Sequence, residues 1–97
     1  MRRAARVDAN QSEIVAALRK IGAVVLITSQ LKNLFDIIVC FDSKVYLVEI
    51  KDGDKPPSQR KLTSGELDCK ELIESVGVEY HVINNTQEAM KLIGKLK

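Results

Sequence analysis

The chain has 97 residues, of which 45% are hydrophobic and 29% are charged, and its formal net charge is +2. This length allows one domain over residues 1–97, and the composition excludes the disordered, fibrous and membrane-spanning classes. The basic start is not followed by an apolar run, so the sequence predicts a cytoplasmic protein with no membrane partner.

The first predicted element is an amphipathic helix over residues 9–21. Its apolar side chains recur at helical spacing, at Ile14, Leu18 and Ile21. Asp8 is the expected N-cap, and Gly22 is the expected residue at which the helix ends.

Three short β-rich runs follow this helix, joined first by a polar stretch and then by a tight turn. They lie at residues 23–28, 35–41 and 44–51. The spacing predicts an antiparallel meander in which the last two runs form a hairpin. Both hairpin strands are apolar on both faces in places, which indicates the centre of a sheet.

A second helix is expected after Thr63, because Glu66 three residues later completes a capping box. The loop before it, at residues 52–58, contains two prolines that cannot continue a strand. The helix ends at Gly77, and its apolar face is expected to hold Leu67, Leu72, Ile73 and Val76.

The rest of the chain adds a fourth strand at residues 78–83 and a last helix at residues 86–96, with Thr86 as its expected cap. The order α-β-β-β-α-β-α predicts an α/β fold with a mixed sheet of about four strands flanked by helices. His81, Tyr46 and Tyr80 are expected to be packing or interface residues, because none has a partner at catalytic spacing.

The candidate chemistry centres on Asp36, Glu49 and Lys51, which lie in or beside apolar strands. A carboxylate at such a position lowers stability unless it is solvated, paired or bound to a metal. Side chains alternate along a strand, so Glu49 and Lys51 share one face. A turn at residues 42–43 pairs Asp36 with Glu49, whereas a turn at residues 43–44 pairs Asp36 with Lys51. Either register brings the three side chains together.

Two adjacent carboxylates repel one another unless a positive charge lies between them, and a hard divalent cation such as Mg²⁺ suits that position. The expected ligands are Asp36, Glu49 and the backbone carbonyl of Ile50, completed by water. Lys51 would orient or deprotonate a metal-bound water, or steady the charge of a phosphate. The alternative is an exposed cross-strand ion pair with no catalytic role.

Basic residues gather at two places in the sequence, which can form a phosphate-facing patch on a nearly neutral protein. One group lies near the start and the other follows the third strand, where neighbouring polar side chains can bond to a phosphate backbone. The alternative is an ordinary solvated surface. The expected nucleic-acid-binding residues are Arg3, Arg6, Lys55, Ser58, Gln59, Arg60 and Lys61.

The pattern Asp36…Glu49-Ile50-Lys51, placed after an N-terminal helix, resembles the PD-(D/E)XK nuclease superfamily, which has a restriction-endonuclease-like α-β-β-β-α-β core. Two longer segments are similar to small stand-alone members of the VRR-NUC (virus-type replication-repair nuclease) family. They are residues 6–11, RVDANQ, and residues 48–63, VEIKDGDKPPSQRKLT.

The resemblance implies a metal-dependent endonuclease that hydrolyses phosphodiester bonds of DNA with Mg²⁺ or Mn²⁺ as its cofactor. Small phage and bacterial members are similar to Holliday-junction resolvases, which implies a homodimer acting on branched DNA. Asp36 and Glu49 would then be metal ligands and Lys51 the catalytic lysine. One alternative is a catalytically inactive DNA-binding module of the same fold, and another is an interaction domain that binds no nucleic acid.

The resemblance also implies a polar residue on the first helix that completes the site, and Gln11 and Glu13 compete for this role. The two side chains are about 200° apart on a helix, and the helical geometry argues against either pointing at the metal. Glu13 also fits an ordinary first-turn acid that interacts with the helix dipole.

The sequence departs from the family directly before Asp36. The family has a Gly-rich stretch and a proline there, whereas this chain has residues 29–35, SQLKNLF. A proline stiffens the entry to the strand, and glycines allow DNA to approach the backbone closely. The departure puts the local geometry and the fit of the substrate in doubt.

Overall fold

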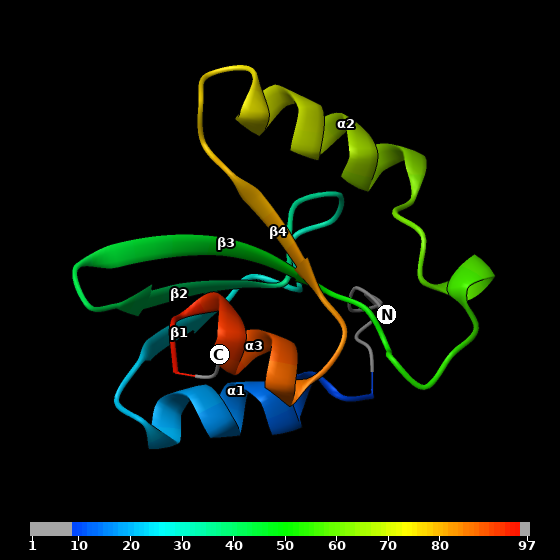
Figure 1. Ribbon diagram of the computed structural model, residues 1–97. Helices are drawn as coiled ribbons and strands as arrows, with labels where there is room; N and C mark the ends of the chain where they lie inside the picture. The colour runs from blue at the N-terminus through cyan, green and yellow to red at the C-terminus, as the bar shows by residue number, and fades with distance from the viewer. Residues whose placement is uncertain (1–8, 96–97) are drawn as a thin grey trace.

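One mixed four-stranded sheet forms the centre of the fold, and three α-helices flank it (Figure 1). The computed structural model describes residues 9–95. β1, β2 and β3 form an antiparallel meander, and β4 lies parallel to β3 at the edge. This confirms the expected α/β fold and its order. In chain order the elements are α1 (Gln11–Lys20), β1 (Val24–Ile27), β2 (Ile37–Phe41), β3 (Lys44–Ile50), the 3₁₀ helix η1 (Pro57–Gln59), α2 (Ser64–Glu74), β4 (Tyr80–Ile83) and α3 (Thr86–Leu92).

The hydrophobic core lies on the face of the sheet that α1 and α3 cover. Alternate strand residues point into it, and Ile14, Val15 and Leu18 of α1 meet them at the expected helical spacing. Burying one such side chain contributes about 1.5–3 kcal/mol. The strand residues in this core are Val25, Ile37, Val39, Val48, Ile50 and Ile83.

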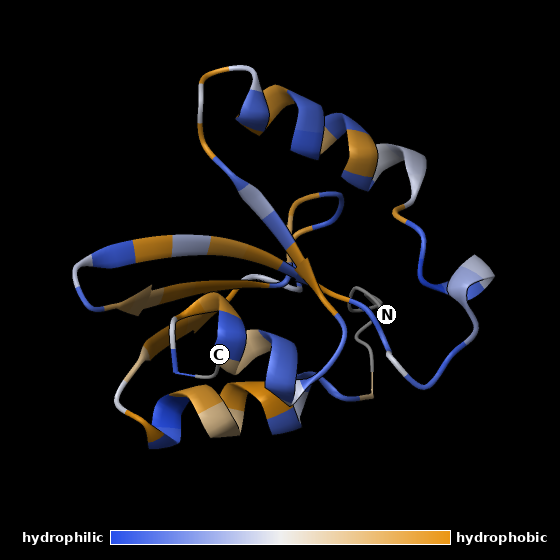
Figure 2. Cartoon of the chain, viewed as in Figure 1, coloured by the Kyte–Doolittle hydropathy of each residue, from blue (hydrophilic) through white to orange (hydrophobic). Residues whose placement is uncertain are grey.

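The opposite face of the sheet, which we call the open face, has α2 as its one neighbouring helix among residues 9–95 (Figures 1 and 2). α2 ends at Glu74, so Val76, which was expected on its apolar face, follows the helix, and the expected end at Gly77 is wrong. The helix has no buried residue, and Leu72 is 73% exposed. Periodicity alone identifies an apolar face and not the surface that covers it. Within this chain α2 contacts β4 and leaves most of its apolar surface uncovered.

Two expected helix caps also need correction. α1 begins at Gln11 after Asn10, whose side chain makes no capping bond, and the expected cap Asp8 lies outside the described residues. α3 is capped by Asn85, whose side chain accepts the Glu88 amide, so the expected cap Thr86 is instead the first helical residue. An asparagine and a threonine in adjacent positions can each cap a helix, and only the backbone conformation selects one.

The capping box of α2 is confirmed, with the Thr63 side chain accepting from the Glu66 amide at 3.2 Å. Gly22 follows its helix with positive φ, as expected of a helix end, and Gly77 also has positive φ. The strands are one to two residues shorter than predicted, and α3 ends at Leu92. Within residues 9–95 no helix is long and apolar enough to cross a bilayer.

Candidate active site

Asp36 and Glu49 lie opposite each other across the β2–β3 hairpin, on its open face. Residue Ile37 pairs with Val48, which is the register set by a turn at residues 42–43. Both turn residues have positive φ, 51° and 64°, as a tight two-residue hairpin requires. Of the two registers that the sequence left open, the structure therefore has the one that pairs Asp36 with Glu49.

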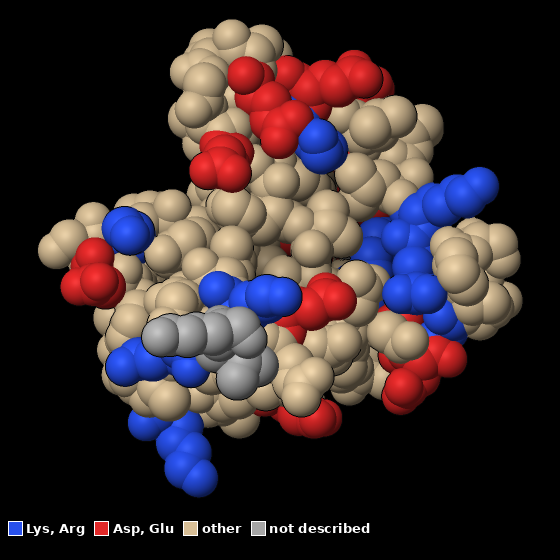
Figure 3. Space-filling model, viewed as in Figure 1, with Lys and Arg blue, Asp and Glu red and all other residues tan. Residues whose placement is uncertain are grey.

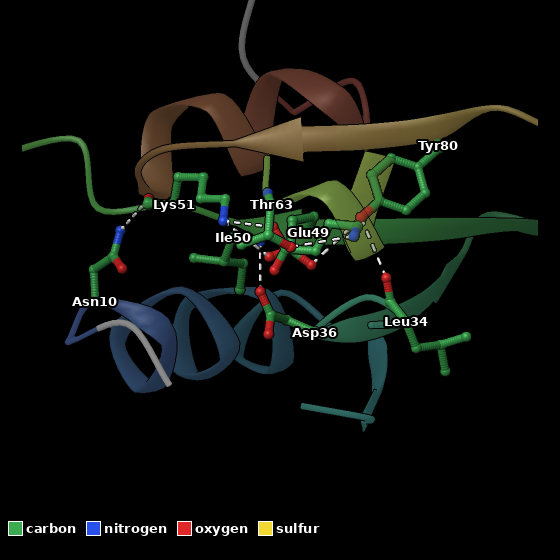
Figure 4. Close-up of polar contacts among 9 residues, drawn as sticks. Asn10, Leu34, Asp36, Glu49, Ile50, Lys51, Thr63 and Tyr80 are labelled. Atoms are coloured by element: carbon green, nitrogen blue, oxygen red, sulfur yellow. Dashed lines mark hydrogen bonds and ion pairs between the residues drawn. The ribbon is translucent and has the colours of Figure 1, made fainter. Parts of the chain in front are cut away.

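Backbone hydrogen bonds hold Asp36 in place although it precedes β2. Its amide donates to the Val48 carbonyl at 2.9 Å, and its carboxylate oxygen Oδ2 accepts the Ile50 amide at 2.8 Å (Figure 4). Its carbonyl accepts the Thr28 amide, while the Thr28 hydroxyl donates to the Phe35 carbonyl. The segment before Asp36 is thus held by Thr28 through these two hydrogen bonds.

Glu49 is a buried acid, with only 4% of its surface exposed. Its burial, followed by the negative charges of Asp36 and Glu66, raises its pKa from 4.5 to about 9, although Lys51 acts in the opposite direction. A carboxyl group held in this way destabilises the folded chain near neutral pH. Such a shift, caused by burial and by specific charged neighbours, is typical of functional sites.

Lys51 lies between two carboxylates on the same face (Figure 4). Its ammonium group is 3.5 Å from Glu49 Oε2 and 2.8 Å from Glu66 Oε1. The same Glu66 oxygen accepts the Thr63 amide at 3.0 Å. Burial alone would raise the pKa of Glu66, but the hydrogen bonds from Lys51 and Thr63 outweigh it and lower that pKa. Glu66 therefore joins the start of α2 to the site.

Glu66 and Tyr80 are site residues that the sequence did not reveal. The sequence already gave Glu66 a structural role in the capping box of the second helix, and its distance along the chain from Lys51 did not indicate a contact between them. Tyr80, expected to pack, does pack edge-on against Phe35, but its hydroxyl also lies 3.5 Å from Glu49 Oε1 and 3.3 Å from the Leu34 carbonyl. Burial and the charge of Glu49 raise the pKa of Tyr80, so it stays a neutral donor.

The donor set fits a hard divalent cation. Within residues 9–95 no group of three or more His, Cys, Asp or Glu side chains is arranged to hold a metal ion. Mg²⁺, however, is commonly held by one or two carboxylates and completes its shell with other oxygens and water. Asp36 and Glu49 supply two carboxylates. The amide of Ile50 points to Asp36, and in an extended residue the carbonyl lies on the same side, so the Ile50 carbonyl faces that side too.

Of the two candidates on α1, Gln11 is buried and Glu13 is exposed. The Gln11 side chain donates to Ser29 Oγ at 3.1 Å, and its own oxygen has no hydrogen-bond partner within the described residues 9–95. Ser29 follows Thr28, the residue that binds the Asp36 carbonyl. Gln11 thus binds the segment that leads to Asp36, and its role in the site stays a prediction.

A third polar residue of this segment, Asn10, connects α1 to the end of the sheet. Its side-chain amide donates to the carbonyls of Lys51 and Asn84, at 3.1 Å and 2.9 Å. The Gly53 amide donates to the same Asn84 carbonyl at 3.0 Å. These bonds fix the chain directly after Lys51, at the point where β3 passes into the basic loop.

The expected nucleic-acid-binding residues of the loop lie at the same end of the molecule as the site, where lysine and arginine side chains gather (Figure 3). Ser58, Gln59 and Lys61 are exposed, whereas Lys55 and Arg60 are partly buried. Two of the loop residues fall in η1, which was not expected. The expected residues Arg3 and Arg6 lie outside the described part of the chain.

Comparisons with known proteins returned nothing: no family model matches the chain, and no curated protein or solved structure does.

Proposed function

We propose that this protein is a metal-dependent deoxyribonuclease of the VRR-NUC type, with Asp36, Glu49 and Lys51 as its catalytic residues. The observation that carries the proposal is the placement of a buried Glu49 opposite Asp36 and beside Lys51. The alternative of an exposed ion pair does not account for a carboxyl group that is 4% exposed and whose pKa is raised to about 9.

The contacts of each site residue support a particular role for it in this proposal. Asp36 and Glu49 would hold Mg²⁺ or Mn²⁺ together with the Ile50 carbonyl, and the bound ion would activate water and polarise the phosphodiester. Lys51 supplies an ammonium group on the same face, where it can donate to a phosphate oxygen. Glu66 holds that ammonium group at 2.8 Å and so limits the positions it can take.

The substrate that we propose is DNA, and branched DNA in particular. The basic loop after β3 would contact phosphates beside the catalytic residues, which positions a backbone without reading its sequence. In a homodimer, two sites related by a twofold axis would cut two strands of a junction symmetrically.

A cleavage assay tests this proposal. The purified chain, supplied with Mn²⁺ or Mg²⁺, is expected to cut four-way junctions or flaps in preference to linear duplex. Asp36→Asn keeps an oxygen that can accept the Ile50 amide but removes the charge, so cleavage should fall at least about 100-fold.

Asp42→Asn is the matched control, because it makes the same chemical change in the exposed hairpin turn. It should cleave like the unmodified chain. Intact junctions, flaps and single strands with both metals would overturn the enzyme proposal. Salt-dependent binding of DNA without cleavage would point instead to the inactive DNA-binding module.

A further inference from the structure

The two edge strands of the sheet, β1 and β4, are protected to different extents (Figure 1). At the β4 edge, the Tyr80 amide donates to Glu74 Oε2 at 3.5 Å, and the Asn84 amide donates to Glu88 Oε1 at 2.8 Å. The two carboxylates come from α2 and α3, and they satisfy the outward backbone amides at both ends of β4. Charged side chains at an edge hinder the pairing of a further strand with it.

The edge of β1 leaves backbone groups unpaired. The Thr28 amide donates to the Asp36 carbonyl at 2.8 Å, and such bonds recur at every second residue of an antiparallel ladder. In the register of β1 with β2, the backbone groups of Val25 and Ile27 therefore point away from β2. The Arg19 guanidinium donates to the Val25 carbonyl at 2.7 Å. Among residues 9–95, the Val25 amide and both backbone groups of Ile27 have no hydrogen-bond partner.

The side chains along this edge are apolar. β1 has the sequence VVLI, and Val24, Leu26 and Ile27 are 56%, 53% and 50% exposed. A groove of about 270 Å³ lies between β1 and α1, and it is lined by Gln11, Ser12, Val15, Ala16, Arg19 and Ile27. The edge thus combines open backbone hydrogen-bonding groups with an adjacent groove, as do sheet edges that bind extended peptides.

We propose that the β1 edge binds an extended segment of a partner protein, which adds to the sheet as a further strand. Such a segment presents its own N–H and C=O groups at the two-residue spacing of Val25 and Ile27, so the two backbones can pair. An apolar side chain of the segment would enter the groove beside Ile27 and Val15. Pairing requires the Ile27 groups and the Val25 amide, so Arg19 can keep its bond to the Val25 carbonyl.

The charge beside the groove indicates which kind of segment fits. Arg19 and Lys20 are both exposed and form the basic last turn of α1, and Arg19 lines the groove. Acidic side chains at the ends of the partner segment would complement them. A second copy of β1 would instead bring another Arg19 and Lys20 to the same place. The inference goes beyond the proposed nuclease activity, because neither metal nor DNA takes part in it.

Binding of a synthetic peptide tests this inference. The probe is a short fluorescent peptide that alternates valine and threonine and carries a glutamate at each end. Fluorescence polarisation measures its binding to the full chain, without metal or DNA, and binding should slow hydrogen exchange at the Val25 and Ile27 amides. The same peptide with N-methylated amides, or with lysines in place of its glutamates, should bind at least about tenfold more weakly.

Two variants of the chain should weaken the binding of this peptide at least about tenfold. Ile27→Pro removes one outward amide, at an edge position of the kind that tolerates proline. Ala16→Glu changes an exposed residue of α1 and places a carboxylate in the groove. Val82→Pro is the matched control, because Val82 precedes Ile83, whose carbonyl accepts from Lys51, and its own amide therefore faces outward from β4. It should bind the peptide like the unmodified chain.

The outcomes that would contradict the inference are distinct. No binding of the peptide at about 1 mM would overturn it. Binding that Ile27→Pro and Ala16→Glu leave unchanged, in variants with the circular dichroism spectrum of the unmodified chain, would also overturn it, as would an equal loss in Val82→Pro. Self-association that protects the same two amides without peptide would assign the edge to a second copy, which is a different occupant.

Discussion

Glu49 shows at the scale of a single residue how a site can oppose the stability of its fold. The folded chain binds a proton at Glu49 with a pKa of about 9, whereas an unfolded chain has the ordinary value of 4.5. Between these two values the folded state binds more protons than the unfolded state. The proton on Glu49 therefore contributes its full stabilisation of the folded state below pH 4.5. This contribution is lost as the pH rises towards 9.

Replacing Glu49 with glutamine should remove this loss. In metal-free buffer Glu49→Gln should have a flatter dependence of Tm on pH, and at pH 8 a Tm higher by on the order of 5–10 °C. Thermal unfolding followed from pH 5 to about pH 9 measures both curves. Parallel curves for the variant and the unmodified chain would show that Glu49 does not titrate as its burial predicts.

Glu66 makes two of its contacts through a single carboxylate oxygen. One carboxylate oxygen accepts both the Lys51 ammonium and the Thr63 amide, so the capping of α2 and the position of Lys51 are coupled. A glutamine can also complete a capping box, which makes it possible to separate the two roles.

Glu66→Gln should keep the helix and weaken catalysis. Stability should change by less than about 1 kcal/mol, since the amide oxygen can still accept from Thr63. The kcat for DNA cleavage should fall about 10- to 100-fold with little change in KM, because the bond to Lys51 loses its charge.

Glu71→Gln serves as the control for this change. Glu71 lies on the same helix and is exposed. This variant should cleave like the unmodified chain. If Glu66→Gln cleaves as fast as Glu71→Gln, Lys51 does not depend on Glu66 for its position.

At the scale of elements, the junction of α1, β3 and β4 fixes the chain where the site passes into the basic loop. Gly53 lies in this junction without positive φ, so it is needed for space and not for its backbone conformation. A Cβ added there would lie 2.7 Å from the Asn84 carbonyl oxygen, which accepts from both Gly53 and Asn10. Backbone cannot move aside as the end of a flexible side chain can.

Gly53→Ala should consequently destabilise the fold by about 1–3 kcal/mol, through overpacking and the loss of one or both of these bonds. Chemical denaturation measures the change. Asp54→Ala, one residue further along the same loop and exposed, should stay within about 0.5 kcal/mol of the unmodified chain. Equal stability of the two variants would mean that the loop shifts freely at this point.

α2 behaves differently from the other two helices. α1 and α3 bury residues in the core, whereas α2 is held by its capping box, by Glu66 and by a contact between Glu74 and the Tyr80 amide at 3.5 Å. Polar contacts at its two ends therefore hold this helix, which has no fully buried side chain. This is why a helix with a clear apolar pattern can stand on the surface of the monomer.

At the scale of the whole molecule, the two faces of the sheet differ in what covers them and in the residues they carry. One face is closed by α1 and α3 and supplies the hydrophobic core. The other carries the candidate site at the end beside α2 and exposed apolar side chains elsewhere. The radius of gyration of 13.1 Å is that of a fully folded domain of this length, so the open face does not result from loose packing.

The sequence by itself determined the order of elements, the central hairpin and the convergence of Asp36, Glu49 and Lys51. These follow from short-range rules, because the alternation of side chains brings the three together in either hairpin register. The capping box of α2 was equally readable, since it depends on residues three apart.

Only the tertiary structure decided the rest. Glu66 reaches Lys51 across 15 positions, and Tyr80 reaches Glu49 across 31. Neither contact has a spacing rule, because each depends on where the fold places a separate element. The exposure of α2 could not be predicted from the sequence for the same reason. Periodicity shows which side of a helix is apolar, whereas the packing of the whole chain decides whether that side is covered.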